Sequence, residues 1–175
     1  MNIMIPAWID GTLQPVEKLE AHKRGLKHKA ISVFVFHNDK ILLQRRALGK
    51  YHTPGLWANT CCTHPNWNET DTDCANRRIF EELHLTGLEL KNRGKIEYRA
   101  DVGQGLIEHE VVEIFTAICS TPPKVTPNPE EVMETKWLDQ IKLANKVETN
   151  PDEFTPWLRI YMSKHFEQIS GTIIA

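Results

Sequence analysis

The segment that most constrains the fold is AISVFVF, which spans residues 30–36. Its β-branched and aromatic residues form a continuous apolar run of strand length, which is typical of a fully buried strand. The sequence HNDK follows, and Asn38 and Asp39 suit a tight turn. The next apolar segment, ILLQRR at 41–46, is therefore predicted to pair back as the second strand of a hairpin.

The rest of the chain alternates predicted strands and helices. After a loop at 47–55, LWANT reads as a short strand that leads into a cysteine-containing loop, and Thr70 or Asp71 can cap a helix whose first turn is acidic. The later elements are predicted in this order: a helix at 69–85, strands at 95–102 and 106–118 joined by the turn GQG, a strand that passes into a helix at 135–141, and a closing helix at 154–168. This mixed order predicts a single α+β domain over residues 1–175, with a mixed sheet flanked by helices.

Composition excludes several classes of partner. The 175 residues carry a formal net charge of −2 without a long basic run, which argues against a nucleic-acid-binding face. No segment has the length and apolarity of a membrane span, and the N-terminus does not resemble a secretory signal. Four cysteines in such a chain predict a reducing, cytoplasmic compartment. Nothing in the sequence indicates an obligate protein partner.

Two carboxylates fall on the apolar face of the predicted strand at 107–118. Because strand side chains alternate between faces, Glu108 and Glu110 share a face with Val112 and Ile114. Burying unpaired carboxylates is costly, and two close together repel each other. Either a positive group neutralises them, or the strand end reaches water.

The predicted helix at 69–85 carries two pairs of opposite charges at a spacing of four. Arg77 precedes Glu81, and Arg78 precedes Glu82. Such pairs are common on helix surfaces and stabilise them little. The functional alternative directs Glu82 toward a metal ion and Arg78 toward an anion.

Histidines and acids supply the side chains for a mixed nitrogen and oxygen site. A single histidine is more often an ordinary surface or core residue, but together the set suits a six-coordinate divalent ion better than tetrahedral zinc. Its candidate members are His22, His28, His64, Glu108 and Glu110. Trp157, at helical spacing, is either a core residue or a ring that lines a pocket and can stabilise a cation.

The segment WANTCCTHP, residues 57–65, matches the pattern W-x-N-[ST]-x-C-x-H-P. This pattern resembles that of the type 1 isopentenyl diphosphate isomerases, which have the Nudix fold, and the resemblance extends roughly from Lys18 to Trp157. The cysteine of the pattern is catalytic in that family and separates its members from Nudix hydrolases. It aligns with Cys62, whereas Cys61 falls on the variable position and is expected to be a packing residue.

The resemblance implies a role for each matching residue. The implied catalytic residues are Cys62, Glu110, Tyr98 and Trp157. The implied diphosphate-binding residues are Lys18, Arg45 or Arg46, Lys50 and Arg78. The implied metal-binding residues are His22, His28, His64, Glu108 and Glu110, together with Glu82, whose Mg²⁺ bridges to the substrate diphosphate, and Cys62. The implied cofactors are that Mg²⁺ and, in the His/Glu site, Mn²⁺ or another divalent ion such as Zn²⁺.

The Nudix box of this chain departs from the family frame G-x5-E-x7-R-E-U-x-E-E-x-G-U at three positions. Thr63 and His84 stand where the frame has glycine, and Arg78 stands where it has a metal-binding glutamate. The Arg78 change is typical of the isomerases and argues against hydrolysis.

The expected activity is therefore the conversion of isopentenyl diphosphate to dimethylallyl diphosphate in isoprenoid biosynthesis. A simple alkene has no acidic hydrogen, so the resemblance implies protonation first, a tertiary carbocation, and then loss of a proton. A Nudix diphosphate hydrolase is the first alternative, although it would not need Cys62. A non-enzymatic metal-binding domain is the second, and it would leave Cys62, Tyr98 and Trp157 unexplained.

Overall fold

Strand β3 (Lys27–His37) runs through the middle of a mixed sheet, and its course confirms the strand predicted from AISVFVF. The computed structural model describes residues 3–171. Strand β8 (Ile107–Ile118) pairs with β3 in parallel along most of its length. Residues 30–36 are all buried because helices cover both faces of this central pair, which is why the run is apolar without alternation.

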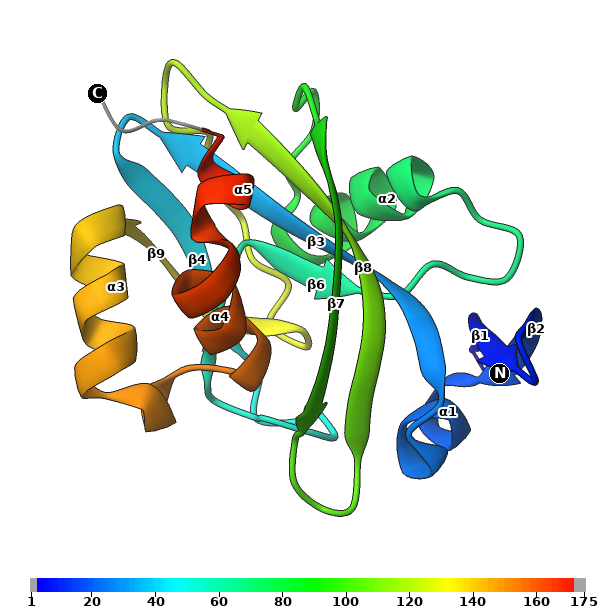
Figure 1. Cartoon of the computed structure of the whole chain (residues 1–175). Coiled ribbons are helices and arrows are strands. Elements are labelled where there is room, and N and C mark those ends of the chain that lie inside the picture. The colour runs from blue at the N-terminus through cyan, green and yellow to red at the C-terminus, as the bar shows by residue number, and fades with distance from the viewer. Residues whose placement is uncertain (1–2, 172–175) are drawn as a thin grey trace.

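Helices cover both faces of the sheet (Figure 1), and each face has its own hydrophobic core. On one face, helix α2 (Asp71–Leu83) contributes Ile79 to the core that also contains Ile31 of β3. The other face is covered by α3 (Gln140–Thr149), α4 (Pro156–Ile160), the π-helical turn η2 (Tyr161–His165) and α5 (Phe166–Ser170). There the ring of Tyr161 packs against Phe34 at a centroid distance of 5.7 Å, and Trp157 belongs to the same core. This arrangement confirms the predicted α+β class, with a mixed sheet flanked by helices.

The remaining elements complete the sheet and its connections. The N-terminal segment, for which the sequence reasoning predicted no element, forms a hairpin of β1 (Met4–Ile9) and β2 (Thr12–Glu17) followed by α1 (Lys18–Arg24). The other elements are β4 (Lys40–Arg46), β5 (Trp57–Ala58), β6 (Cys61–Thr63), β7 (Lys91–Asp101), β9 (Val132–Asp139) and the short helix η1 (Pro151–Glu153). The predicted GQG hairpin is confirmed by the antiparallel pairing of β7 with β8.

Two predictions around β3 need correction. Strand β4 pairs with β3 only beside the turn, at Phe36↔Ile41 and His37↔Lys40, and then diverges from it. Further along, β4 pairs with the short strand β5, while β9 pairs with β4 along nearly its whole length. The cysteine segment, predicted to be a loop, is strand β6, which pairs with β3 in the space that β4 leaves. Long-range pairing decided both outcomes, because the local pattern of 30–46 is equally suited to a complete hairpin.

Helix α2 begins as predicted, and its end explains one departure from the Nudix frame. The side chain of Thr70 caps the helix by accepting a hydrogen bond from the backbone N–H of Asp73 at 3.1 Å. His84 has a φ of 53°, a left-handed conformation that glycine adopts most easily. The ring nitrogen Nδ1 of His84 donates to the carbonyl oxygen of Thr126 at 2.7 Å, and this hydrogen bond holds the His84 side chain in place. Thr63, in contrast, lies in extended strand β6, where no glycine is required.

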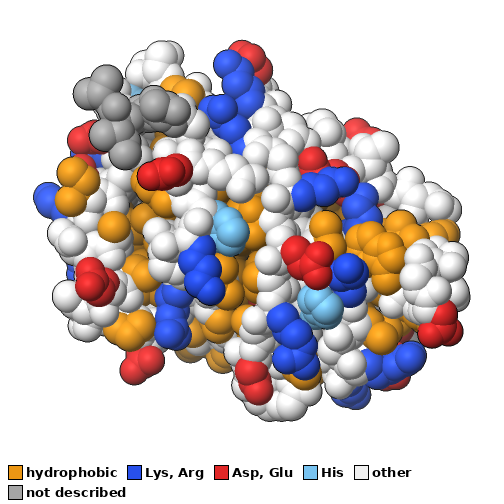
Figure 2. All heavy atoms as spheres, in the orientation of Figure 1, with side chains coloured by type: hydrophobic (Ala, Val, Ile, Leu, Met, Phe, Trp, Pro, Cys, Tyr) orange, Lys and Arg blue, Asp and Glu red, His pale blue; other side chains and the backbone are white. Residues whose placement is uncertain are grey.

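On the face shown in Figure 2, basic and acidic side chains are interspersed over the surface and form no continuous basic patch. Within residues 3–171, no helix combines the length and apolarity needed to cross a membrane.

Candidate active site

The strand register brings the candidate residues together at one end of the sheet. Tyr98 on β7 lies directly opposite Glu110 on β8, and Glu110 lies beside His28 on β3. Further along β3, Ser32 lies opposite Cys62 on β6. Residues opposite one another on neighbouring strands project from the same face, so these side chains enter one buried region.

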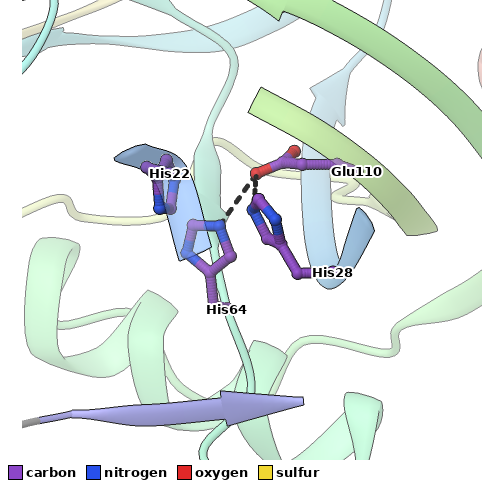
Figure 3. A group of neighbouring side chains, drawn as sticks. All are labelled: His22, His28, His64 and Glu110. Carbon is purple, nitrogen blue, oxygen red and sulfur yellow. Dashed lines mark hydrogen bonds and ion pairs between the residues drawn. The ribbon is translucent and has the colours of Figure 1, made fainter. Parts of the chain in front are cut away.

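Three histidines and Glu110 form a compact group in which each contributes a ligand atom within 4.8 Å of the others. They come from four separate segments: His22 from α1, His28 from β3, His64 from the segment after β6, and Glu110 from β8. Figure 3 shows the four side chains facing one another. His64 Nε2 donates to Glu110 Oε1 at 2.8 Å, and His28 Nε2 lies 3.6 Å from the same oxygen.

Backbone carbonyls orient two of these rings. Nδ1 of His22 donates to the carbonyl oxygen of Lys18 at 2.7 Å, and Nδ1 of His28 donates to that of Leu26, also at 2.7 Å. This arrangement leaves Nε2 of each ring as the lone-pair atom, buried and without a hydrogen-bond partner among the described residues.

The residues of this group fit a divalent cation. Burial lowers the pKa of His22 to about 4, with repulsion from His28 adding to the shift, and burial also holds the pKa of His64 well below its ordinary value. Neutral imidazoles and a carboxylate are the donor atoms that divalent metal ions take. Unpartnered buried nitrogens are costly unless something occupies them, so a bound ion accounts for His22 Nε2 and His28 Nε2.

Glu108 and Glu110 are both buried, with relative exposures of 3% and 5%, so the alternative in which the strand end reaches water is wrong. The hydroxyl of Tyr98 donates to Glu110 Oε2 at 2.6 Å and also lies 3.0 Å from Glu108 Oε2. Burial and repulsion from Glu110 raise the pKa of Glu108 well above its usual range. Burial also acts to raise the pKa of Glu110, but His28 and His64 outweigh it and hold that pKa well below the usual range.

Sequence reasoning missed His52, which forms a second group with His22 and Glu108 whose ligand atoms also lie within 4.8 Å of one another. His52 lies in the loop between β4 and β5, and its Nε2 is 3.6 Å from Glu108 Oε1. The sequence contains the segment KYH at 50–52, but no spacing relates it to another ligand. Only the fold brings it to the site.

Four cations converge at the other end of the same pocket: Lys18, Arg46, Lys50 and Arg78. Burial, together with repulsion from the three other cations, lowers the pKa of Lys18 to about 8. Positive charge gathered in this way is suited to an anion. Sequence reasoning also missed Glu131, whose carboxylate pairs with Lys50 and lies 3.3 Å from Arg78 Nη2.

Arg45 lies away from this cation group. Alternation along β4 directs it out of the pocket, where its side chain is 41% exposed and lies 3.6 Å from Glu134. Of the two arginines that the resemblance left open, the structure therefore brings Arg46 into the pocket. Arg46 is buried, and its Nη2 donates to the carbonyl oxygen of His52 at 3.1 Å.

Glu82 is buried beside the cation group and lies outside both His/Glu groups. Arg78 Nη2 donates to its Oε1 at 2.6 Å, and Gln44 Nε2 donates to its Oε2 at 2.9 Å. The surface-pair alternative fits Arg77 and Glu81, which meet at 3.1 Å with both side chains partly exposed. It does not fit Glu82, whose side chain is only 5% exposed.

The adjacent cysteines project to opposite sides of β6. Cys61 is fully buried in the core beneath α2, in agreement with the expected packing role. Cys62 points to the pocket, where its thiol donates to Asn59 Oδ1 at 2.9 Å and lies 2.9 Å from Ser32 Oγ. Burial raises the pKa of the Cys62 thiol above its ordinary value, which keeps it protonated.

Trp157 is both a core residue and a wall of the pocket. Its side chain extends from α4 into the buried core. The guanidinium of Arg46 lies 5.2 Å from the centroid of its ring. The ring therefore already faces one cation.

The pocket unites ten of the predicted site residues. Its walls contain Lys18, Arg46, Lys50, Cys62, His64, Arg78, Tyr98, Glu108, Glu110 and Trp157, together with Tyr51, His52 and Thr63. A larger hollow of about 850 Å³ lies elsewhere, between α3 and α4, and is lined mostly by uncharged side chains. The candidate site residues therefore gather in the smaller, charged pocket.

Comparison with known proteins identifies the family of this chain. The model of the NUDIX domain matches residues 26–158. Proteins named isopentenyl-diphosphate Delta-isomerase from Dinoroseobacter shibae and Cereibacter sphaeroides are 61% and 62% identical, in each case over 99% of this chain and 98% of the relative. A Deinococcus radiodurans structure has a TM-score of 0.73 at 11% identity, covering 91% of this chain and 96% of its own, which shows a shared fold. The chain therefore belongs to the Nudix family, within its isopentenyl-diphosphate Delta-isomerase branch.

Proposed function

We propose that this protein converts isopentenyl diphosphate to dimethylallyl diphosphate in isoprenoid biosynthesis. The observation that carries the proposal is the pocket itself, which joins a cation group to Cys62 and Glu110 in one buried space. Relatives about 60% identical over nearly the whole chain carry the name of this isomerase. A small isoprenoid diphosphate is thus the partner of the site.

The cation end of the pocket binds the diphosphate. Lys18, Arg46, Lys50 and Arg78 supply the charge-assisted hydrogen bonds that phosphate oxygens accept. Glu82, at the edge of this group, would hold a Mg²⁺ ion that also contacts the diphosphate. Holding the polar end in this way leaves the five-carbon tail against Cys62, Tyr98 and Trp157.

Cys62 and Glu110 perform the two proton transfers. One proton is added to the terminal CH₂ carbon of the alkene, and the π electrons form that C–H bond and leave a tertiary carbocation. A second proton then leaves the neighbouring methylene, and its C–H electrons form the new double bond. The protonated thiol of Cys62 and the ionised carboxylate of Glu110 are suited to opposite directions of transfer.

The surrounding residues support these transfers. The hydrogen bond from Tyr98 at 2.6 Å orients the Glu110 carboxylate. Trp157 presents a ring that stabilises a cation without trapping it as a nucleophile would. The buried walls exclude water, which would otherwise convert the carbocation to an alcohol.

The His/Glu group binds a divalent metal ion, which we propose to be Mn²⁺ or another divalent ion such as Zn²⁺. His22, His28, His64, Glu108 and Glu110 would hold it. When bound, such an ion supplies positive charge that favours the ionised form of Glu110. Loss of the ion would leave buried histidine nitrogens without partners.

The cellular compartment and the partners of the protein are also part of this proposal. The four cysteines are all free, which supports a reducing, cytoplasmic compartment. We propose that residues 1–175 act as one domain on a small-molecule substrate, without a nucleic acid, a membrane or an obligate protein partner.

Hydrolysis is the alternative reaction. Structures named as Nudix hydrolases share the fold, for example one from Burkholderia pseudomallei with a TM-score of 0.60 at 18% identity, covering 78% of this chain and 95% of its own. The resemblance places Arg78 where hydrolases have a metal-binding glutamate, and this arginine is committed to Glu81 and Glu82 at 2.8 and 2.6 Å. A guanidinium cannot bind a metal ion, so hydrolysis is disfavoured.

Incubation with isopentenyl diphosphate and Mg²⁺ in D₂O separates the two reactions. The isomerase should place deuterium in the new methyl group of dimethylallyl diphosphate, and NMR of the product detects the label directly. Phosphate and pyrophosphate release should stay at the level of a protein-free control. Phosphate release without deuterium incorporation would overturn the assignment.

A further inference from the structure

His52 is directed into the metal-binding region by its own loop. Its side chain is buried, and Nδ1 lies 3.1 Å from the hydroxyl of Thr53, which leaves Nε2 facing Glu108. The following residue, Thr53, has a φ of 46°, an unfavourable conformation for a β-branched side chain. Strain of this kind persists where the surrounding structure enforces it, and it gathers at functional sites.

The two His/Glu groups belong to one metal-binding centre. Both contain His22, and Nδ1 of that ring is already engaged with the carbonyl oxygen of Lys18. Only Nε2 of His22 is free to bind an ion, and one nitrogen lone pair binds one ion. The ring of His52 stacks on that of His22 at a centroid distance of 5.9 Å and an interplanar angle of 27°, so both rings border the same space.

We propose that His52 is a sixth protein ligand of the divalent ion in the His/Glu centre. With Glu108, it would join His22, His28, His64 and Glu110 in holding the ion. Six nitrogen and oxygen donors would satisfy a six-coordinate divalent ion without a ligand from water or substrate. The ion would then be a structural part of the pocket wall, and the substrate diphosphate would engage the separate cation group. The inference rests on the proposed metal centre, and its tests use metal alone, without substrate.

The first test measures Co²⁺ binding to the metal-free protein by equilibrium dialysis and visible absorption. His52→Ala should weaken binding by at least the roughly 10- to 100-fold that loss of an outer partner of a metal ligand causes. Its Co²⁺ spectrum should also intensify, because coordination numbers below six absorb more strongly. His109→Ala is the matched control: His109 lies between Glu108 and Glu110 in sequence but points to the opposite face, where it pairs with Glu97 at 3.2 Å. Wild type and this control should each bind one ion with the same affinity and spectrum.

A second variant gives a positive signal that a folding defect cannot imitate. In His52→Cys, a thiolate at position 52 should produce a sulfur-to-cobalt charge-transfer band in the near ultraviolet when one equivalent of Co²⁺ is added. The same band should be absent from wild type and from His109→Cys. Co²⁺ bound by His52→Cys without this band would overturn the proposal. So would His52→Ala with unchanged affinity and spectrum, or a second ion per wild-type chain that His52→Ala loses.

Discussion

Removing one oxygen atom, in Tyr98→Phe, tests how the buried carboxylate pair is held. The hydroxyl donates to Glu110 at 2.6 Å and lies 3.0 Å from Glu108, and all three side chains are buried. A hydrogen bond to a charged group contributes about 1.5–3 kcal/mol. At 1.36 kcal/mol per factor of ten, kcat should fall by about 10- to 160-fold if Glu110 needs this bond during proton transfer.

The assay follows dimethylallyl diphosphate formation at several substrate concentrations, with thermal unfolding measured on the same samples. KM should change much less than kcat, because the cation group binds the diphosphate. Tyr161→Phe is the matched comparison, because it deletes a buried hydroxyl whose partner, Ser32 Oγ at 2.9 Å, is neutral. A hydrogen bond between neutral groups contributes only about 0.5–1.5 kcal/mol, so kcat should fall less than in Tyr98→Phe. A kcat for Tyr98→Phe within about twofold of wild type, in a folded protein, would refute the reasoning.

Four further outcomes follow from the site. Cys62→Ala should lower kcat by at least the roughly 10²–10⁴-fold of a lost acid–base group, whereas Cys61→Ala should retain activity and lower only the unfolding temperature; the reverse result would show that Cys61 is the pocket thiol. Glu110→Gln should be inactive even when elemental analysis confirms bound metal, and chelation should inactivate wild type; full activity in metal-free protein would contradict the metal site. Glu82→Gln should raise the Mg²⁺ and substrate concentrations needed for half-maximal rate, and unchanged values would exclude its proposed role. Because the pKa of Lys18 is lowered to about 8, its charge is present below that pH and lost above it, so KM should rise as the pH passes above about 8; in Lys18→Arg, which stays charged, that rise should disappear.

The sequence alone determined those features that depend on short stretches of chain. The apolar run at 30–36 requires burial on both faces whatever its neighbours are, and Thr70 followed by acidic residues favours a helix start in any context. Alternation along a strand was enough to place Glu108 and Glu110 on one face, because side-chain direction is a local property of extended backbone. The resemblance of WANTCCTHP likewise distinguished Cys62 from Cys61 before any contact was known.

Tertiary structure alone decided which distant segments meet. The hydrophobic pattern could not show that β3 pairs in parallel with β8, or that β4 diverges from β3 and β6 pairs there instead. A simple hairpin would bury the same apolar side chains as these pairings do. His52 and Glu131 lie in connecting segments, where no periodicity relates a side chain to a partner far along the chain. Their roles follow from position in space, which is set by packing across the whole sheet rather than by any local preference of the backbone.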